Sequence, residues 1–210
     1  MQNNLTETGG RDGGRAQTNT TTTKTKRHIA FERVGGNPSP SFPILALDPG
    51  TDKTALVIYN GKEILRHEIL ENEEMRSLLG EILPAFKGKV WCEVVKSYGM
   101  AVGASVFKTC QAIGRFEQIS EENGHWFHEV GRLAVKTHLC KSARAKDANV
   151  RQALIDLVGE QGKKAAPGPT YGIKSHTWAA LAVAVYGYDQ QFLHNANTPG
   201  IQAAPCLESK

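Results

Sequence analysis

The stretch ILALDPGTDKTALVIYNGKEI, residues 44–64, decides how the fold is interpreted. Its apolar beginning predicts a buried β-strand, and the strand ends on an acid, Asp48, just before a Pro-Gly turn. A second strand is predicted at Ala55–Tyr59, and Asn60-Gly61 favours a tight hairpin turn into a third, Ile64–Leu70. An ionised carboxylate in an apolar strand is costly unless a partner compensates its charge. Asp48 is therefore a candidate functional residue.

The remainder of the central region alternates between helix and strand patterns. The segment KVWCEVV, Lys89–Val95, predicts a fourth strand and again contains one acid, Glu93. The predicted helices are Glu73–Leu83, Ala101–Asn123, Ala143–Val158 and about Ser175–Tyr188, with a fifth strand at His125–Val130. This element order predicts an α/β domain built on a mixed β-sheet.

The 210 residues suffice for one domain with a proper core and additional tails. Residues 1–41 are polar, include four consecutive threonines and carry six Lys or Arg against three acids, which predicts a disordered basic leader. The folded domain is expected at 42–190. Residues 191–210 are expected to form a loose C-terminal tail.

Composition also indicates the compartment. No apolar run approaches the roughly 20 residues that span a bilayer, and the polar N-terminus lacks the apolar core of a secretion signal. The four cysteines are scattered without metal-binding spacing, which is typical of reduced thiols: Cys92, Cys110, Cys140 and Cys206. We therefore expect a cytoplasmic protein that does not associate with membranes.

Two acids within apolar strands point to a shared site. If the first and fourth strands are neighbours, Asp48 and Glu93 can meet on one face of the sheet, where their hard oxygen ligands would suit Mg²⁺ or Mn²⁺. His176 begins the last predicted helix and is a third candidate. Alternatively, Asp48 caps its own turn, Glu93 pairs with a lysine, and His176 is simply a residue at the helix start.

Three segments resemble a known family. LALDPGTDKTALVIYNG resembles the opening hairpin of the ribonuclease H-like superfamily, and its DPG is similar to that of the RuvC-type Holliday-junction resolvases. WCEVVKSYGMAVGASVFKTCQAIGRFEQ is similar to their second motif, and KSHTWAALAVAV to their closing helix. The resemblance covers about residues 44–188. It implies a ribonuclease H-like mixed β-sheet flanked by helices and a metal-dependent endonuclease for Holliday junctions or other branched DNA. The polar leader and the compact domain would suit a phage-encoded branch of this family.

The resemblance also implies roles for individual residues. Asp48 and Glu93 match the two strand acids that bind metal, and His176 matches the first functional position of the closing helix; two Mg²⁺ or Mn²⁺ ions per site are implied. The family pattern has another Asp three residues after that position, where this chain has Ala179. Either Ala179 is an engineered replacement of a catalytic Asp, or this branch uses another acid, for which Asp147 is the candidate. Asp147 is otherwise a solvated helix charge or a partner of Arg151.

Basic residues suggest where DNA would bind. Between residues 132 and 151 there are six Lys or Arg against one acid, and phosphate neutralisation by such residues gives salt-dependent affinity. The candidate DNA contacts are Lys53, Tyr98, Lys136, Lys141, Arg144, Lys146, Arg151 and Lys174. Tyr98 either stacks on an unpaired base or packs on the sheet. A homodimer would match the two-fold symmetry of a four-way junction.

The sequence also allows other functions. The same fold would suit an exonuclease or an RNA-processing nuclease. The missing acid at Ala179 favours a catalytically inactive junction-binding protein. An ATPase of the sugar-kinase type shares the DPGT turn, but this sequence lacks the second phosphate loop and the adenosine motif.

Overall fold

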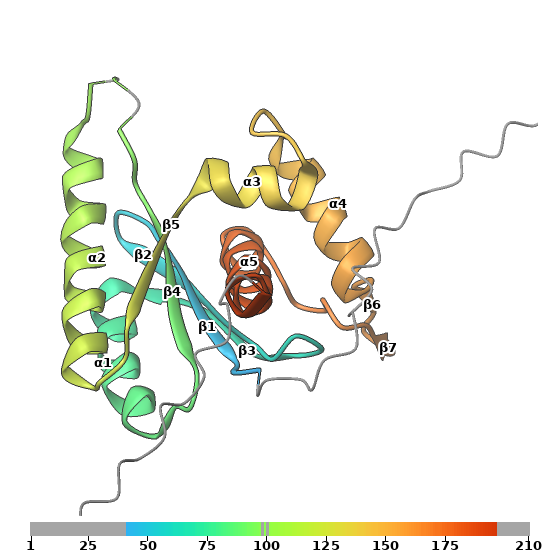
Figure 1. Cartoon of the computed structure of the whole chain (residues 1–210), viewed down its shortest axis with the longest axis horizontal. Helices are drawn as coiled ribbons and strands as arrows, with labels where there is room; N and C mark the ends of the chain where they lie inside the picture. Colours follow the sequence, from blue (N-terminus) through green and yellow to red (C-terminus); the bar gives the residue numbers. More distant parts are fainter. Residues whose placement is uncertain (1–40, 98, 100, 197–210) are drawn as a thin grey trace, which may run out of the picture. The chain divides into compact units, whose positions relative to one another are not determined.

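The computed structural model describes residues 41–97, 99 and 101–196, and the side chains as far as Leu193 (Figure 1). Most of the predicted leader, Tyr98 and residues 197–210 lie outside this part. The strands are β1 (Ile44–Pro49), β2 (Lys53–Tyr59), β3 (Ile64–Glu71), β4 (Lys89–Val94), β5 (Phe127–Gly131), β6 (Gly162–Lys163) and β7 (Ala166–Pro167). The helices are α1 (Asn72–Ile82), the 3₁₀ turn η1 (Leu83–Ala85), α2 (Ala104–Glu122), α3 (Arg132–Cys140), α4 (Asp147–Val158) and α5 (Thr177–Ala196).

The main sheet is mixed and has the strand order β3-β2-β1-β4-β5. The first three strands form an antiparallel meander, whereas β4 and β5 run parallel to β1. The parallel connections require crossovers, and α2 provides the one between β4 and β5. The predicted mixed sheet is therefore confirmed, including the neighbouring positions of the first and fourth strands.

Two apolar cores lie on opposite faces of the sheet (Figure 1). Helices α1 and α2 cover one face, where Leu45 and Leu47 of β1 are fully buried. Helix α5, with α3 and α4 beside it, covers the other face, where Ile44 and Ala46 are buried. Because side chains alternate along a strand, Asp48 continues the row that faces α5. The α5 face is thus the one on which a site can form.

One helix was not predicted. Helix α3 follows β5 without a loop, and only Val135 of its nine residues is buried, so this short helix gives a weak signal in the sequence. The prediction that a helix starts at Ala143 was wrong. Lys141 adopts a left-handed conformation, with φ of 56°, and ends α3 there, so the next helix begins only at Asp147.

The predicted boundary of the C-terminal tail was also wrong. Helix α5 continues to Ala196, and Gln191 is buried. The Gln191 side-chain oxygen accepts a hydrogen bond from the Phe42 backbone N–H at 3.1 Å, and its Nε2 donates one to the Phe42 carbonyl at 3.0 Å. The Phe192 ring packs edge-on against Tyr188 and extends the apolar contact. Residues 191–196 therefore belong to the folded domain. In the described part of the chain, no helix combines the length and apolar character needed to cross a bilayer.

Candidate active site

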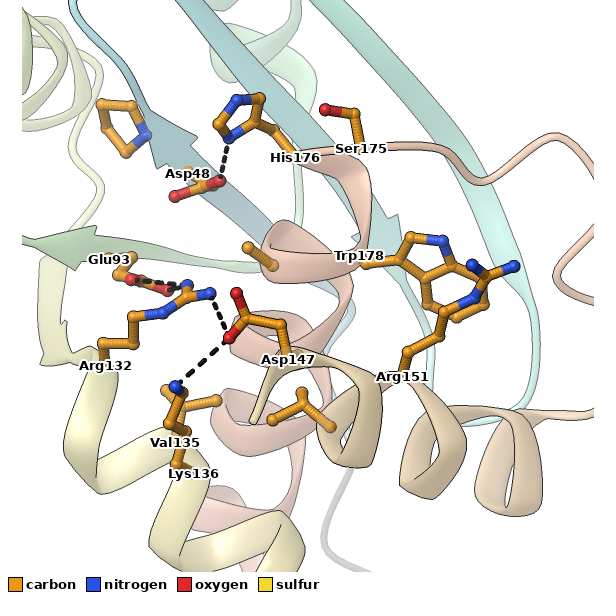
Figure 2. Close-up of a pocket in the computed structure, with 14 residues that line it drawn as sticks. Asp48, Glu93, Arg132, Val135, Lys136, Asp147, Arg151, Ser175, His176 and Trp178 are labelled. Carbon is orange, nitrogen blue, oxygen red and sulfur yellow. Dashed lines mark hydrogen bonds and ion pairs between the residues drawn. The ribbon is translucent and has the colours of Figure 1, made fainter. Parts of the chain in front are cut away.

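Asp48 and Glu93 lie side by side at the ends of adjacent parallel strands. Leu47 of β1 pairs with Cys92 of β4, so the next residue on each strand is the acid. Both carboxylates face α5, and each side chain is only 12% exposed. They line one pocket of about 400 Å³ (Figure 2). The sheet register therefore fixes the two acids together on one face.

His176 reaches Asp48 from the segment that leads into α5. Its Nδ1 lies 3.2 Å from Oδ2 of Asp48, while the imidazole itself is 66% exposed (Figure 2). The preceding residue, Ser175, has a φ of 41°, which is unusual for a residue other than glycine and turns the chain sharply before the helix. The three residues that the family resemblance selected thus border the same pocket.

Burial, together with the nearby charge of Glu93, raises the pKa of Asp48 from 3.8 to about 6, against the opposing effects of His176 and Arg132. Ionising both strand acids is therefore unfavourable without additional positive charge. A divalent cation beside the pair would favour the ionised carboxylates. The two carboxylates supply hard oxygen ligands of the type that Mg²⁺ and Mn²⁺ accept.

The opposite wall of the pocket is basic and comes from α3 and α4. Arg132 directs Nη1 to both oxygens of Glu93, at 3.1 and 3.3 Å, and Nη2 to Oδ1 of Asp147, at 2.9 Å (Figure 2). Lys136 lies 3.2 Å from the same Asp147 oxygen. Partial burial alone would raise the pKa of Asp147, but its hydrogen bonds to Lys136 and Arg132 outweigh this and lower the pKa. Among the described residues, no group of three or more carboxylate, His or Cys side chains is arranged to hold a metal ion.

The alternative in which Asp147 pairs with Arg151 is wrong. The Arg151 guanidinium lies over the Trp178 ring, 4.9 Å from its centroid, and donates to Gln161 at 3.0 Å. Asp147 instead faces Arg132, which belongs to a different helix. Ala179, the position at which the family pattern has an acid, also lines the pocket.

The remaining predicted DNA contacts lie outside the pocket or outside the described residues. Lys53 forms an exposed ion pair with Glu71 on the neighbouring strand, at 3.1 Å. Tyr98 lies outside the described residues. The other four side chains are exposed on or next to the helices and turns around the pocket: Lys141, Arg144, Lys146 and Lys174. Of the basic residues that line the pocket, Lys136 and Arg151 were predicted as DNA contacts.

Sequence reasoning counted Arg132 as part of a basic run and missed its place between two acids. Its position follows from the sheet, because Glu93 pairs with Val130 of β5 and Arg132 comes two residues later, at the start of α3. The signal in the sequence was a basic residue directly after a strand, which by itself does not identify a partner.

Comparison with known proteins places this geometry in a wider context. No protein-family model and no curated protein sequence matches the chain. Several solved structures match it in three dimensions, and two of them are RuvC structures. The Thermus thermophilus RuvC structure has a TM-score of 0.56 and 21% identity, over 71% of this chain and 96% of that one. T. thermophilus RuvC in complex with a Holliday junction substrate has a TM-score of 0.59 and 19% identity, over 72% and 96%. The domain described here therefore has the ribonuclease H-like fold of the RuvC-type Holliday-junction resolvases.

Proposed function

We propose that this protein is a divalent-metal-dependent, structure-selective DNA endonuclease that cleaves phosphodiesters at Holliday junctions or other branched DNA. The observation that carries the proposal is the adjacent pair Asp48 and Glu93 in a pocket whose opposite wall is basic. The similarity to T. thermophilus RuvC bound to a Holliday junction supports DNA as the substrate class. A homodimer in the cytoplasm of a bacterial or phage-infected cell would fit this role.

In this proposal, Asp48, Glu93 and His176 are the residues that hold Mg²⁺ or Mn²⁺. One ion or a pair, when bound, supplies an activated water and neutralises charge on the leaving oxygen. His176 is also placed to move a proton, because its Nδ1 is oriented by Asp48. Asp147 is the third carboxylate of the pocket, and it acts by holding Arg132 and Lys136 in position.

Exposed basic residues around α3, α4 and the start of α5 would bind the phosphate backbone. Such contacts position DNA without reading its sequence, so structure selectivity must come from the shape of the branch. All the proposed DNA contacts, including Lys53 on β2 and the aromatic Tyr98, are these: Lys53, Tyr98, Lys136, Lys141, Arg144, Lys146, Arg151 and Lys174.

A synthetic four-way junction provides the direct test. We expect nicking in Mg²⁺ or Mn²⁺, with no nicking in EDTA and much less on linear DNA duplex or on RNA. Asp48→Asn should abolish nicking, whereas Asp52→Asn, in the exposed turn that follows, should not. Equal cleavage of RNA would instead support an RNA-processing enzyme, and preferential degradation from DNA ends would support an exonuclease.

Ala179 gives specific support to a second candidate, a junction-binding protein without catalytic activity. Position 179 lines the pocket, so an acid there would face the other carboxylates. If wild-type protein binds junctions but cuts none, and Ala179→Asp begins to cut them, the chain is an inactivated resolvase. Cleavage by the wild type excludes this candidate.

A further inference from the structure

Arg132 links carboxylates from two separate parts of the fold. One side of its guanidinium contacts both oxygens of Glu93 on β4, and the other contacts Asp147 on α4. The Arg132 side chain is 43% exposed and Glu93 only 12%, so the pair lies at the border of the pocket, within reach of a ligand. Charge-assisted hydrogen bonds between a guanidinium and a carboxylate are among the stronger hydrogen bonds in proteins.

The pocket already contains as many fixed cations as acids. Its acidic side chains are Asp48, Glu93 and Asp147, and its basic ones are Arg132, Lys136 and Arg151. One divalent ion would add two positive charges, and a bound phosphodiester would offset about one of them. A second divalent ion would leave a large excess of positive charge, because Arg132, Lys136 and Arg151 already balance the three acids.

We propose that Arg132 is a built-in cation of this site, which neutralises Glu93 and Asp147 and thereby limits the site to one divalent ion, bound on the Asp48 side. The inference rests on the proposed metal-dependent nuclease function and sharpens it. A second ion at Glu93 would have to displace the guanidinium from its contacts with two carboxylates, and would then face an unpaired cation nearby. The Asp48 side has no such obstacle, because among the described residues the Asp48 carboxylate contacts the His176 imidazole and forms no ion pair with a Lys or Arg.

The test is the stoichiometry of Mn²⁺ binding to the full chain without DNA, measured by calorimetry and by electron paramagnetic resonance. Wild type should bind one ion, and Arg132→Gln should bind two. Arg132→Lys, which keeps the charge, should still bind one. Arg115→Gln is the matched control, because Arg115 also bridges two elements through an ion pair with Glu73 but lies outside this pocket. Near-ultraviolet circular dichroism establishes that each variant is folded.

Each outcome decides the inference. One ion in wild type and two in Arg132→Gln supports it. Two ions or none in wild type, one ion in Arg132→Gln, or a second ion gained by Arg115→Gln would overturn it. If Arg132→Gln does not fold, a second ion in Arg132→Lys overturns the inference, and a single ion there beside a single ion in wild type supports it. Nuclease function is tested separately by junction cleavage. A protein that binds one ion but cleaves no junction would contradict the proposed function and still support the inferred stoichiometry.

Discussion

The acidic and basic walls of the pocket are built in different ways. Asp48 and Glu93 are 12% exposed and are attached to paired parallel strands, whereas Arg132 is 43% and Asp147 72% exposed, on helices that pack at the edge of the domain. Strand pairing fixes the acids through a ladder of backbone hydrogen bonds. The basic wall instead depends on side-chain contacts that water and salt can weaken. The comparison indicates that strand pairing fixes the positions of the two acids, whereas side-chain contacts between helices position the basic groups.

The largest expected effect is at the rigid acidic wall. Glu93→Gln removes one charge of the strand pair while keeping its shape, and we expect junction cleavage to fall about 1,000-fold or more, as is typical when an electrostatic element of an active site is lost. Single-turnover cleavage in excess enzyme measures the effect. Glu129→Gln, on the neighbouring strand opposite Cys92, is the matched exposed control and should cleave normally. A loss below 10-fold in Glu93→Gln would contradict a central role for the strand pair.

The exposed basic residues between α3 and α4, outside the pocket, should matter for binding rather than for chemistry. Removing three charges together, Lys141→Ala, Arg144→Ala and Lys146→Ala, should weaken junction binding about 10- to 100-fold near 0.1 M salt. The dependence of log K on log salt should become shallower by about 2–3, since each duplex phosphate contact contributes about 0.9. Fluorescence anisotropy over a salt series measures both quantities.

The control for this experiment is a second triple variant that removes exposed lysines from other parts of the surface: Lys62→Ala, Lys87→Ala and Lys108→Ala. This control should change neither the affinity nor the salt slope substantially. Equal losses in both triple variants would show that binding follows net charge alone. Lys141, Arg144 and Lys146 would then have no special role in binding DNA.

The cost of burying the acid pair predicts a gain in stability. The pKa of Asp48 in the folded protein, about 6, exceeds its ordinary value of 3.8, so the ionised carboxylate destabilises the metal-free fold above pH 6, and this penalty disappears as the pH falls below about 4. Asp48→Asn should therefore raise the free energy of unfolding at pH 8 by about 1–3 kcal/mol. Urea unfolding of wild type and variant at pH 8 and pH 5, in EDTA, measures the difference, which should shrink at the lower pH.

Asp52→Asn, in the exposed turn, should show no comparable gain. Added Mn²⁺ should reverse the order by stabilising wild type more than Asp48→Asn, because only wild type retains both strand carboxylates. If Asp48→Asn is the less stable protein at pH 8 in EDTA, burial of the ionised Asp48 carboxylate does not destabilise the fold. The energetic difference between the two walls is then not supported.

The smallest effect is expected at Asp147, the exposed acid of the basic wall. Asp147→Asn weakens the hold on Arg132 and Lys136, and a contact of this exposure is worth about 1 kcal/mol or less, which corresponds to a loss of about 5-fold in the cleavage rate. Asp156→Asn, on the same helix, is the control. A loss approaching that of Glu93→Gln would give Asp147 a direct catalytic role, as expected if it replaces the acid that position 179 lacks.

The success of the sequence analysis was uneven for a physical reason. Periodicity identified all five strands of the main sheet and the acids within two of them, because a charge in an apolar strand is conspicuous without any knowledge of its partner. It missed α3 because that helix buries little apolar surface, and it ended α5 too early because Gln191 is polar. Both errors concern elements whose stability comes from tertiary contacts rather than from pattern.

The amino-acid sequence by itself determined the mixed α/β architecture, the two strand acids and the basic character of residues 132–151. Tertiary structure alone decided that Arg132 lies between Glu93 and Asp147, that Asp147 does not pair with Arg151, and that Ala179 faces the pocket. Hydrophobic periodicity is a local property, since it reflects which face of a strand or helix is buried. Ion pairs between separate elements depend on strand register and helix packing, which bring together residues that are distant in the sequence.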